Sequence, residues 1–206
     1  SRMPTVDAEL NGKNGEHIPE QLEPYLFHKV ALTWKSGDDN AVGDCPFCGK
    51  EGKFSILIRN GVWRCFVCDE GEDNGKNAKG GNSYIFLRKL HKLSLEATTD
   101  EEYEEIREHR GLLSIESLKA WGVCRSIIDN TTMVPGFNSD GKLIQLYRYV
   151  RINGSWKLLA TKGLSHGIFG AHLYKADKDA NDLCEGPWDG MALWEVKRHA
   201  DRKSVV

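Results

Sequence analysis

Residues 45–68 read CPFCGKEGKFSILIRNGVWRCFVC and contain two Cys-x2-Cys pairs, Cys45 with Cys48 and Cys65 with Cys68. The pairs are separated by 16 residues, which is within the spacing expected when four thiolates bind one zinc ion. Each pair directs two sulfurs at the same point, and the residues between the pairs fold back to complete a tetrahedron. Two disulfides are the main alternative, but nothing in the sequence indicates an oxidising compartment. The pattern therefore predicts a structural zinc site.

The dipeptide Asn60-Gly61 lies between the two cysteine pairs and predicts a two-residue type I′ turn that joins two strands. That turn would place Leu57 opposite Arg64 and Ser55 opposite Phe66. Because Cys65 must reach the metal, we expect its face of the hairpin to be buried. The expected buried face consists of Phe54, Ile56, Ile58, Trp63, Cys65 and Val67.

The other face of this hairpin would present Arg59 and Arg64 beside Phe66. Cations next to an exposed aromatic ring suit the phosphates and stacked bases of a single nucleic-acid strand. The alternative is a solvated strand face on which Phe66 packs under a neighbouring segment. We predict that Arg59, Arg64 and Phe66 contact nucleic acid.

The charge of the chain is unevenly distributed. The net charge is only −2, which does not indicate a globally basic protein. Residues 45–93, however, contain nine Lys or Arg against five Asp or Glu, whereas residues 96–110 contain two against seven. A basic module beside an acidic segment is typical of a phosphate-binding head on a solvated connector, although scattered surface charge explains the same totals.

No part of the sequence indicates a membrane. No apolar run approaches the roughly 18 residues that span a bilayer, and the first ten residues lack the apolar stretch of a secretory signal. We therefore expect a cytoplasmic protein with no membrane partner. Cys124 and Cys184 have no neighbouring cysteine and are expected to be ordinary thiols.

The segments on either side of the cysteines predict helices and then strands. Apolar spacing predicts a short helix near residues 18–30, a second helix capped by Ser83 and therefore beginning at Tyr84, and a third that opens with a capping box at Thr99. A fourth helix is expected from Ser114 to Trp121. Turn signals at 140–141 and 153–154 predict strands over 143–152 and 155–160. A strand is expected to end near 182–185, a further helix to span 191–199, and another strand to begin at 204–206.

These motifs resemble, in order, those of DNA primases. Residues 45–68 resemble the primase zinc ribbon, and 80–87 (GGNSYIFL) resemble the glycine-rich turn and helix that follow it. Residues 110–123 are similar to the entry of the polymerase domain, and 134–173 to its basic N-terminal subdomain. Residues 184–190 (CEGPWDG) resemble the first motif of the TOPRIM fold. The bacterial housekeeping type usually has histidine where this chain has Cys48, so the resemblance favours phage-type primases and primase-helicases.

The resemblance implies template-directed synthesis of short RNA primers for DNA replication. Its expected partners are single-stranded DNA, ribonucleoside triphosphates and a replicative helicase in cis or in trans. Glu185 would bind Mg²⁺ or Mn²⁺ or act as an acid or base, and Asp189 would brace the turn or lie near the metal. Arg148 and Lys162 would meet phosphates of template or nucleotide. The second acidic pair of a TOPRIM site, Asp-x-Asp, does not follow Asp189, so we expect the 206 residues not to make primers alone.

The expected fold class is α+β: a small zinc-ribbon β domain and then a mixed α/β polymerase domain. The expected segments are an N-terminal helical segment (1–42), the zinc ribbon (43–95), a linker helix (96–110), the basic subdomain (111–181) and the start of a TOPRIM subdomain (182–206). A rival function is that of a zinc-ribbon DNA-binding or adaptor protein without catalysis. A second rival is another TOPRIM enzyme, a topoisomerase or nuclease, against which the upstream ribbon argues.

Overall fold

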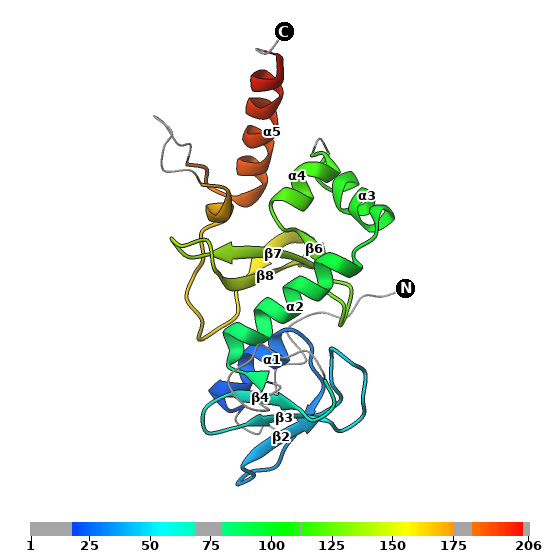
Figure 1. Cartoon of the computed structure of the whole chain (residues 1–206), viewed down its shortest axis with the longest axis vertical. Coiled ribbons are helices and arrows are strands. Elements are labelled where there is room, and N and C mark those ends of the chain that lie inside the picture. The colour runs from blue at the N-terminus through cyan, green and yellow to red at the C-terminus, as the bar shows by residue number, and fades with distance from the viewer. Residues whose placement is uncertain (1–17, 69–79, 112, 175–182, 204–206) are drawn as a thin grey trace.

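A computed structural model describes residues 18–68, 80–111, 113–174 and 183–203 of the chain (Figure 1). The fold is α+β, as predicted, with two antiparallel sheets and helices between and beyond them. The first sheet, the ribbon sheet, has the strand order β1-β2-β3-β4-β5. Its elements are η2 (Glu20–Leu22), α1 (Glu23–Phe27), β1 (Leu32–Thr33), β2 (Asn40–Gly43), β3 (Phe54–Leu57), β4 (Val62–Cys65) and β5 (Gly80–Gly81).

The second sheet, the central sheet, has the strand order β6-β7-β8-β9. It is preceded by three helices and followed by two. The elements are α2 (Ser83–Ala97), α3 (Asp100–Glu108), α4 (Ile115–Ala120), β6 (Cys124–Arg125), β7 (Thr132–Phe137), β8 (Leu143–Ile152), β9 (Ser155–Leu159), η3 (Ala171–Leu173) and α5 (Pro187–Lys203).

The sequence patterns located most of these elements. The strands over β8 and β9 and the helices α3, α4 and α5 are confirmed, and the capping box at Thr99 is formed with Glu102. Helix α2 begins one residue earlier than expected, because the side chain of Asn82 accepts a hydrogen bond from the backbone of Ile85. The strand end expected at 182–185 was wrong for residues 183–185, which form no strand. The strand expected at 204–206 lies outside the described residues.

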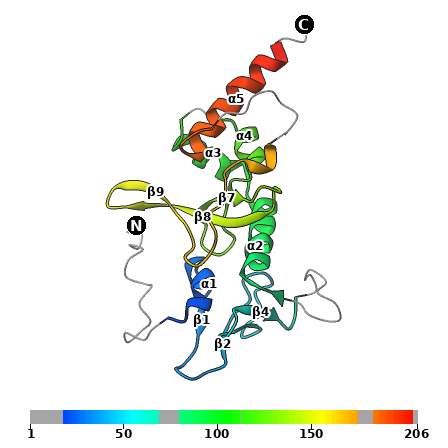
Figure 2. The ribbon, with the colours of Figure 1, turned by 90° about the vertical axis from the view of Figure 1, so that its left-hand side faces the viewer.

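The two sheets share one hydrophobic core through α2. Phe86 of α2 packs against the rings of Tyr25 and Trp63 on the ribbon side. The same cluster of buried residues continues to Leu146 and Met133 of the central sheet, because α2 lies between the sheets (Figures 1 and 2). The segment expected to be a ribbon domain and the segment expected to be the basic subdomain therefore bury their apolar residues together.

A second cluster of apolar residues fills the opposite face of the central sheet. Tyr103 and Ile106 of α3 are the buried residues of that helix, and they pack with Leu118, Val134 and Met191. The Tyr103 hydroxyl donates to the carbonyl of Val123. Helix α3, expected as a linker, is thus attached to the core by its two apolar residues, while its acidic face is exposed.

Among the described residues, no helix has the length and apolar character to cross a membrane.

His28 at the end of α1 lies fully buried between the ribbon segment and the central sheet, with its Nε2 3.4 Å from the Thr161 hydroxyl. Burial, helped by the positive charge of Arg148, lowers the pKa of His28 from 6.5 to about 3. Below pH 6.5 His28 becomes protonated in the unfolded chain, whereas it stays neutral in the folded chain until the pH approaches 3. Stability contributed by neutral His28 should therefore fall as the pH decreases from 6.5 toward 3, by up to about 1.4 kcal/mol per pH unit.

We expect His28→Gln to remove this pH dependence. Urea denaturation measures the free energy of unfolding of both proteins. The value for wild type should fall relative to the value for His28→Gln as the pH decreases from 6.5 to 4.5. The exposed His166→Gln serves as the matched control and should show no such shift. A wild-type-minus-variant difference that stays constant with pH would contradict the prediction.

Candidate metal centre and nucleic-acid interface

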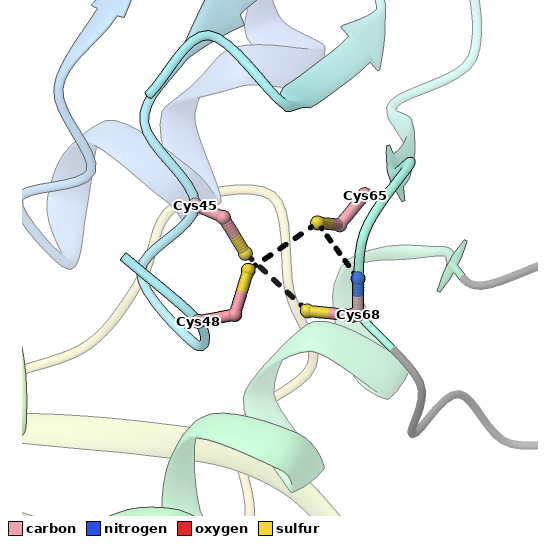
Figure 3. Close-up of side chains that lie close together, drawn as sticks. All are labelled: Cys45, Cys48, Cys65 and Cys68. Atoms are coloured by element: carbon pink, nitrogen blue, oxygen red, sulfur yellow. Dashed lines mark hydrogen bonds between the residues drawn. The ribbon is translucent and has the colours of Figure 1, made fainter. Parts of the chain in front are cut away.

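The four cysteine thiols predicted as metal ligands converge at one end of the ribbon sheet (Figure 3). Their Sγ atoms all lie within 4.8 Å of one another, with 3.5 Å between Cys45 and Cys68 and 3.7 Å between Cys48 and Cys65. A tetrahedral zinc ion with Zn–S bonds of about 2.3 Å holds its sulfurs about 3.8 Å apart. All four cysteines are free of disulfides. The arrangement therefore fits one zinc ion, and no rearrangement of the backbone is needed.

Backbone amides around the cysteines favour the thiolate form that zinc requires. The amides of Val67 and Cys68 point at the Sγ of Cys65, at 3.5 and 3.3 Å. Burial raises the pKa of Cys65, but these hydrogen bonds, together with those from the thiols of Cys68 and Cys45, outweigh burial and lower its pKa to about 7. In contrast, burial raises the pKa of Cys45 to about 11. A bound zinc ion supplies the positive charge that holds such thiols deprotonated.

The register of the hairpin between the cysteine pairs differs from the prediction by two residues. Leu57 pairs with Val62 and Ser55 with Arg64, so the loop spans four residues, not two. The carbonyl of Leu57 accepts hydrogen bonds from the amides of both Asn60 and Gly61, and only Gly61 has a positive φ, of 67°. A type I′ turn needs positive φ at both central residues, so the predicted turn was wrong.

The predicted faces of the hairpin survive this shift, because a slip of two residues keeps every side chain on its original side. Phe54, Ile56, Trp63 and Cys65 are buried, as expected, and Ile58 is half-buried. The prediction was wrong for Val67, which is 36% exposed because it lies two residues beyond the end of β4, where strand alternation no longer applies. The opposite face carries Arg64 on β4, which is exposed. Phe66 is 69% exposed and not packed under a neighbouring segment. Arg59 is also exposed, but on the loop between the strands and not on the sheet itself.

Lys53 is a further cation on this face that the sequence analysis did not single out. The amide of Phe66 donates to the carbonyl of Lys53, which continues the β3–β4 ladder beyond Cys65. Strand alternation then puts Lys53 with Ser55 and Phe66 with Arg64 on the exposed side. The register predicted from the sequence pairs Phe66 with Ser55, whereas the observed register brings Lys53 opposite Phe66. Lys53 was therefore not expected beside the ring. We call Lys53, Arg64 and Phe66 the ribbon face.

The guanidinium of Arg148, which was predicted to bind phosphates, instead forms hydrogen bonds inside the protein. The side chain is 6% exposed and donates to the carbonyl of Phe27, to the Thr131 hydroxyl and to the carboxylate of Asp129. Its pairing opposite Leu159 is as predicted. The sequence could not show this role, because Phe27 is 121 residues away along the chain. We therefore correct the assignment: Arg148 joins the ribbon segment to the central sheet.

Lys162, the other residue expected to meet phosphates, is exposed in the loop after β9. The fold brings it to the ribbon, since it lines an open cavity of about 250 Å³. The cavity is also lined by Asn60 and Gly61 of the ribbon hairpin, by Asn82 and Ser83 at the start of α2, and by Glu20. Lys162 therefore remains available to a ligand.

Glu185 and Asp189, expected in a catalytic metal site, flank the start of α5 and are both exposed. Asp189 lies in the first turn, where its carboxylate opposes the lowering of the Arg110 pKa that burial causes. Within the part of the chain that is described, only the four cysteines form a group of three or more metal-ligating side chains. Helix α5 lies beyond the central sheet from the ribbon (Figures 1 and 2). The structure thus separates these acids from the four cysteines.

The similarity of this chain to known proteins is distant. No family model matches the sequence, and no curated protein matches it. Among solved structures, the chain is similar to the zinc-binding and RNA polymerase domains of the Aquifex aeolicus primase, at 12% identity and a TM-score of 0.26. The match covers 75% of this chain and 56% of that chain. A functional assignment has to come from the side chains of this protein.

Proposed function

We propose that this chain binds single-stranded DNA on its ribbon face, as the zinc-ribbon part of a DNA primase. The observation that carries the proposal is the four-cysteine cluster at the end of a sheet whose exposed side displays Lys53, Arg64 and Phe66 together. Zinc ligation by Cys65 fixes the end of β4, and Phe66 follows immediately. The metal would therefore hold the aromatic ring and the two cations in a preorganised arrangement.

A single strand needs both kinds of contact that this face offers. Its phosphates bind lysine and arginine through charge, which makes affinity depend on salt. Its unpaired bases stack on exposed aromatic rings with little regard to sequence. Phe66 is exposed and lies two residues from Arg64, so a base stacked on its ring would have a cation nearby for the adjoining phosphate.

The proposed enzyme joins ribonucleoside triphosphates into primers on the bound template. We propose that Glu185 and Asp189 belong to a centre for Mg²⁺ or Mn²⁺, since clustered carboxylates bind the metals that neutralise charge in phosphoryl transfer. A replicative helicase is the proposed partner. Lys162 is proposed to bind phosphate beside the ribbon, because its cavity connects the loop after β9 with the hairpin of β3 and β4.

The ribbon face makes a direct prediction. Phe66→Ala should weaken binding of a labelled 12-nucleotide single strand by about 5- to 160-fold, since stacking on one aromatic side chain is worth about 1–3 kcal/mol. Arg64→Gln should weaken it less and reduce the slope of log affinity against log salt by about one. Fluorescence anisotropy over a salt series measures both, with the exposed Lys142→Gln, in the loop between β7 and β8, as the matched control. Unchanged affinity in both ribbon variants would refute the proposal.

The rival function, a zinc-ribbon DNA-binding or adaptor protein without catalysis, shares the ribbon face but does not need Glu185. Glu185→Gln in the full-length gene product separates the two. Loss of primer synthesis on a single-stranded template, with DNA affinity kept, favours the primase. DNA binding without synthesis by wild type or variant favours the adaptor.

A further inference from the structure

A second exposed aromatic side chain, Trp156, lies far from the ribbon face. It belongs to β9, and 41% of its surface is exposed. Its ring stacks on Tyr149 of β8, with 4.8 Å between ring centroids and 18° between ring planes. Tyr149 itself is only 6% exposed. Trp156 is thus the outer member of a stacked pair whose inner member is buried. The ring of His109 also lies against Trp156, with 5.3 Å between ring centroids.

The inner ring of this pair is held by a cation and a third aromatic residue. The guanidinium of Arg110 lies 4.5 Å from the Tyr149 ring centroid and 4.6 Å from that of Trp188, and it also contacts the Tyr149 hydroxyl. Trp188 meets Tyr149 edge-on at 5.1 Å. Trp188 immediately precedes Asp189 in the first turn of α5. The contacts through Tyr149 and Arg110 therefore connect the exposed Trp156 with that turn. A rigid support of this kind lowers the entropy lost when another ring stacks on Trp156.

The hairpin that carries Trp156 is basic. Strand pairing puts Arg151 of β8 directly opposite Trp156, on the same face of the sheet, and Arg151 is exposed. Lys157 follows on the other face and is also exposed. No Asp or Glu occurs from residue 141 to residue 176 of the sequence. Figure 2 shows this β8–β9 hairpin extending away from the rest of the central sheet.

We propose that Trp156 and Arg151 form a second contact for a single nucleic-acid strand, in which a base stacks on Trp156 and Arg151 binds a neighbouring phosphate. The proposal rests on the proposed function, because it concerns the same single-stranded ligand. It goes beyond that function by giving the central sheet a stacking residue of its own, linked through Tyr149 to the start of α5. The strand would then contact both sheets.

The charge of the hairpin favours nucleic acid over an apolar protein partner. A purely apolar partner would leave Arg151 and Lys157 facing apolar surface without a counter-charge. A strand supplies a phosphate beside each base, so one ligand satisfies the ring and the cation together. The cross-strand distance between paired residues on a sheet, about 5 Å, is comparable with the spacing of base and phosphate within one nucleotide.

Binding of the 206-residue chain to two fluorescein-labelled 12-nucleotide probes tests this proposal. One probe carries a base at every position. The other has the same sugar–phosphate backbone but an abasic site at every position. We expect Trp156→Ala to weaken binding of the first probe about 5- to 20-fold and to leave binding of the abasic probe within about twofold. Trp156→Phe keeps a ring and should retain affinity within about threefold. Tyr174→Ala, which removes a 59% exposed aromatic ring elsewhere, is the matched control and should bind as wild type.

The outcomes separate this inference from the proposed function. If Phe66→Ala weakens binding and Trp156→Ala does not, the hairpin contact is wrong and the ribbon face stands. If Trp156→Ala weakens both probes equally, the residue acts by supporting the fold, and the inference is also wrong. If wild type binds neither probe at low salt, the proposed function and the inference both fail. A 5-iodouracil probe that crosslinks to the peptide containing Trp156 would support the contact independently of variant stability.

Discussion

Cys65→Ser is expected to abolish stoichiometric zinc binding and to unfold the ribbon sheet. A serine hydroxyl is a poor replacement for a thiolate, and the three remaining cysteines leave the tetrahedron incomplete. Structural zinc contributes about 10–16 kcal/mol of apparent binding free energy in small zinc-binding peptides, so even a fraction of this exceeds the stability of a small domain. We therefore expect a loss of at least about 4 kcal/mol in the free energy of unfolding, or no cooperative unfolding of the ribbon at all.

The position of the cysteines in the core explains why this effect should spread. Cys45, Cys65 and Cys68 belong to the same buried cluster as Trp63 and Phe86. Loss of the metal should therefore loosen α2 as well as β3 and β4. Metal analysis by mass spectrometry and thermal unfolding measure the two effects, and Cys184→Ser, outside the cluster, should keep one zinc ion per chain. A reduced, folded wild-type chain that contains no zinc would overturn the metal assignment.

Arg148→Met is expected to cost about 3 kcal/mol of stability without changing the affinity for DNA. The substitution removes the partner of the Asp129 carboxylate, whose side chain is 23% exposed, and frees the carbonyl of Phe27. Removal of one member of a buried ion pair costs about 3–5 kcal/mol, and partial access of water to Asp129 favours the lower end. Urea denaturation measures the loss.

Two further variants sharpen this test. Arg151→Met, on the same strand but exposed, should change the free energy of unfolding by less than about 0.5 kcal/mol. Adding Asp129→Asn to Arg148→Met removes the uncompensated charge and should recover part of the loss. If Arg148→Met instead leaves stability intact and lowers the salt dependence of DNA binding, the original assignment of Arg148 to phosphate is right and ours is wrong.

The two arginines of β8 show where sequence reasoning reaches its limit. Arg148 and Arg151 both occur in a basic stretch, and the strand that carries them was predicted correctly. Their positions differ by three residues, so they lie on opposite faces of the sheet. One face packs toward the ribbon segment, where Arg148 donates a hydrogen bond to the carbonyl of Phe27. Arg151 lies on the other face and is exposed to solvent. Which face meets which segment depends on long-range packing, which local spacing does not contain.

The sequence by itself determined the features that depend on short-range chemistry. The two Cys-x2-Cys pairs predict the four-sulfur cluster, because each pair has only one way to direct both thiols at an ion. Alternation along the hairpin predicts the buried Trp63 and the exposed Arg64. The tertiary structure alone decided the register of β3 on β4, the burial of Arg148, the approach of Lys162 to the ribbon and the support of Trp156 by Arg110. The register is set by the four-residue loop that the hairpin adopts. The other three join residues that are far apart in the sequence, so their contacts form only when those segments pack together.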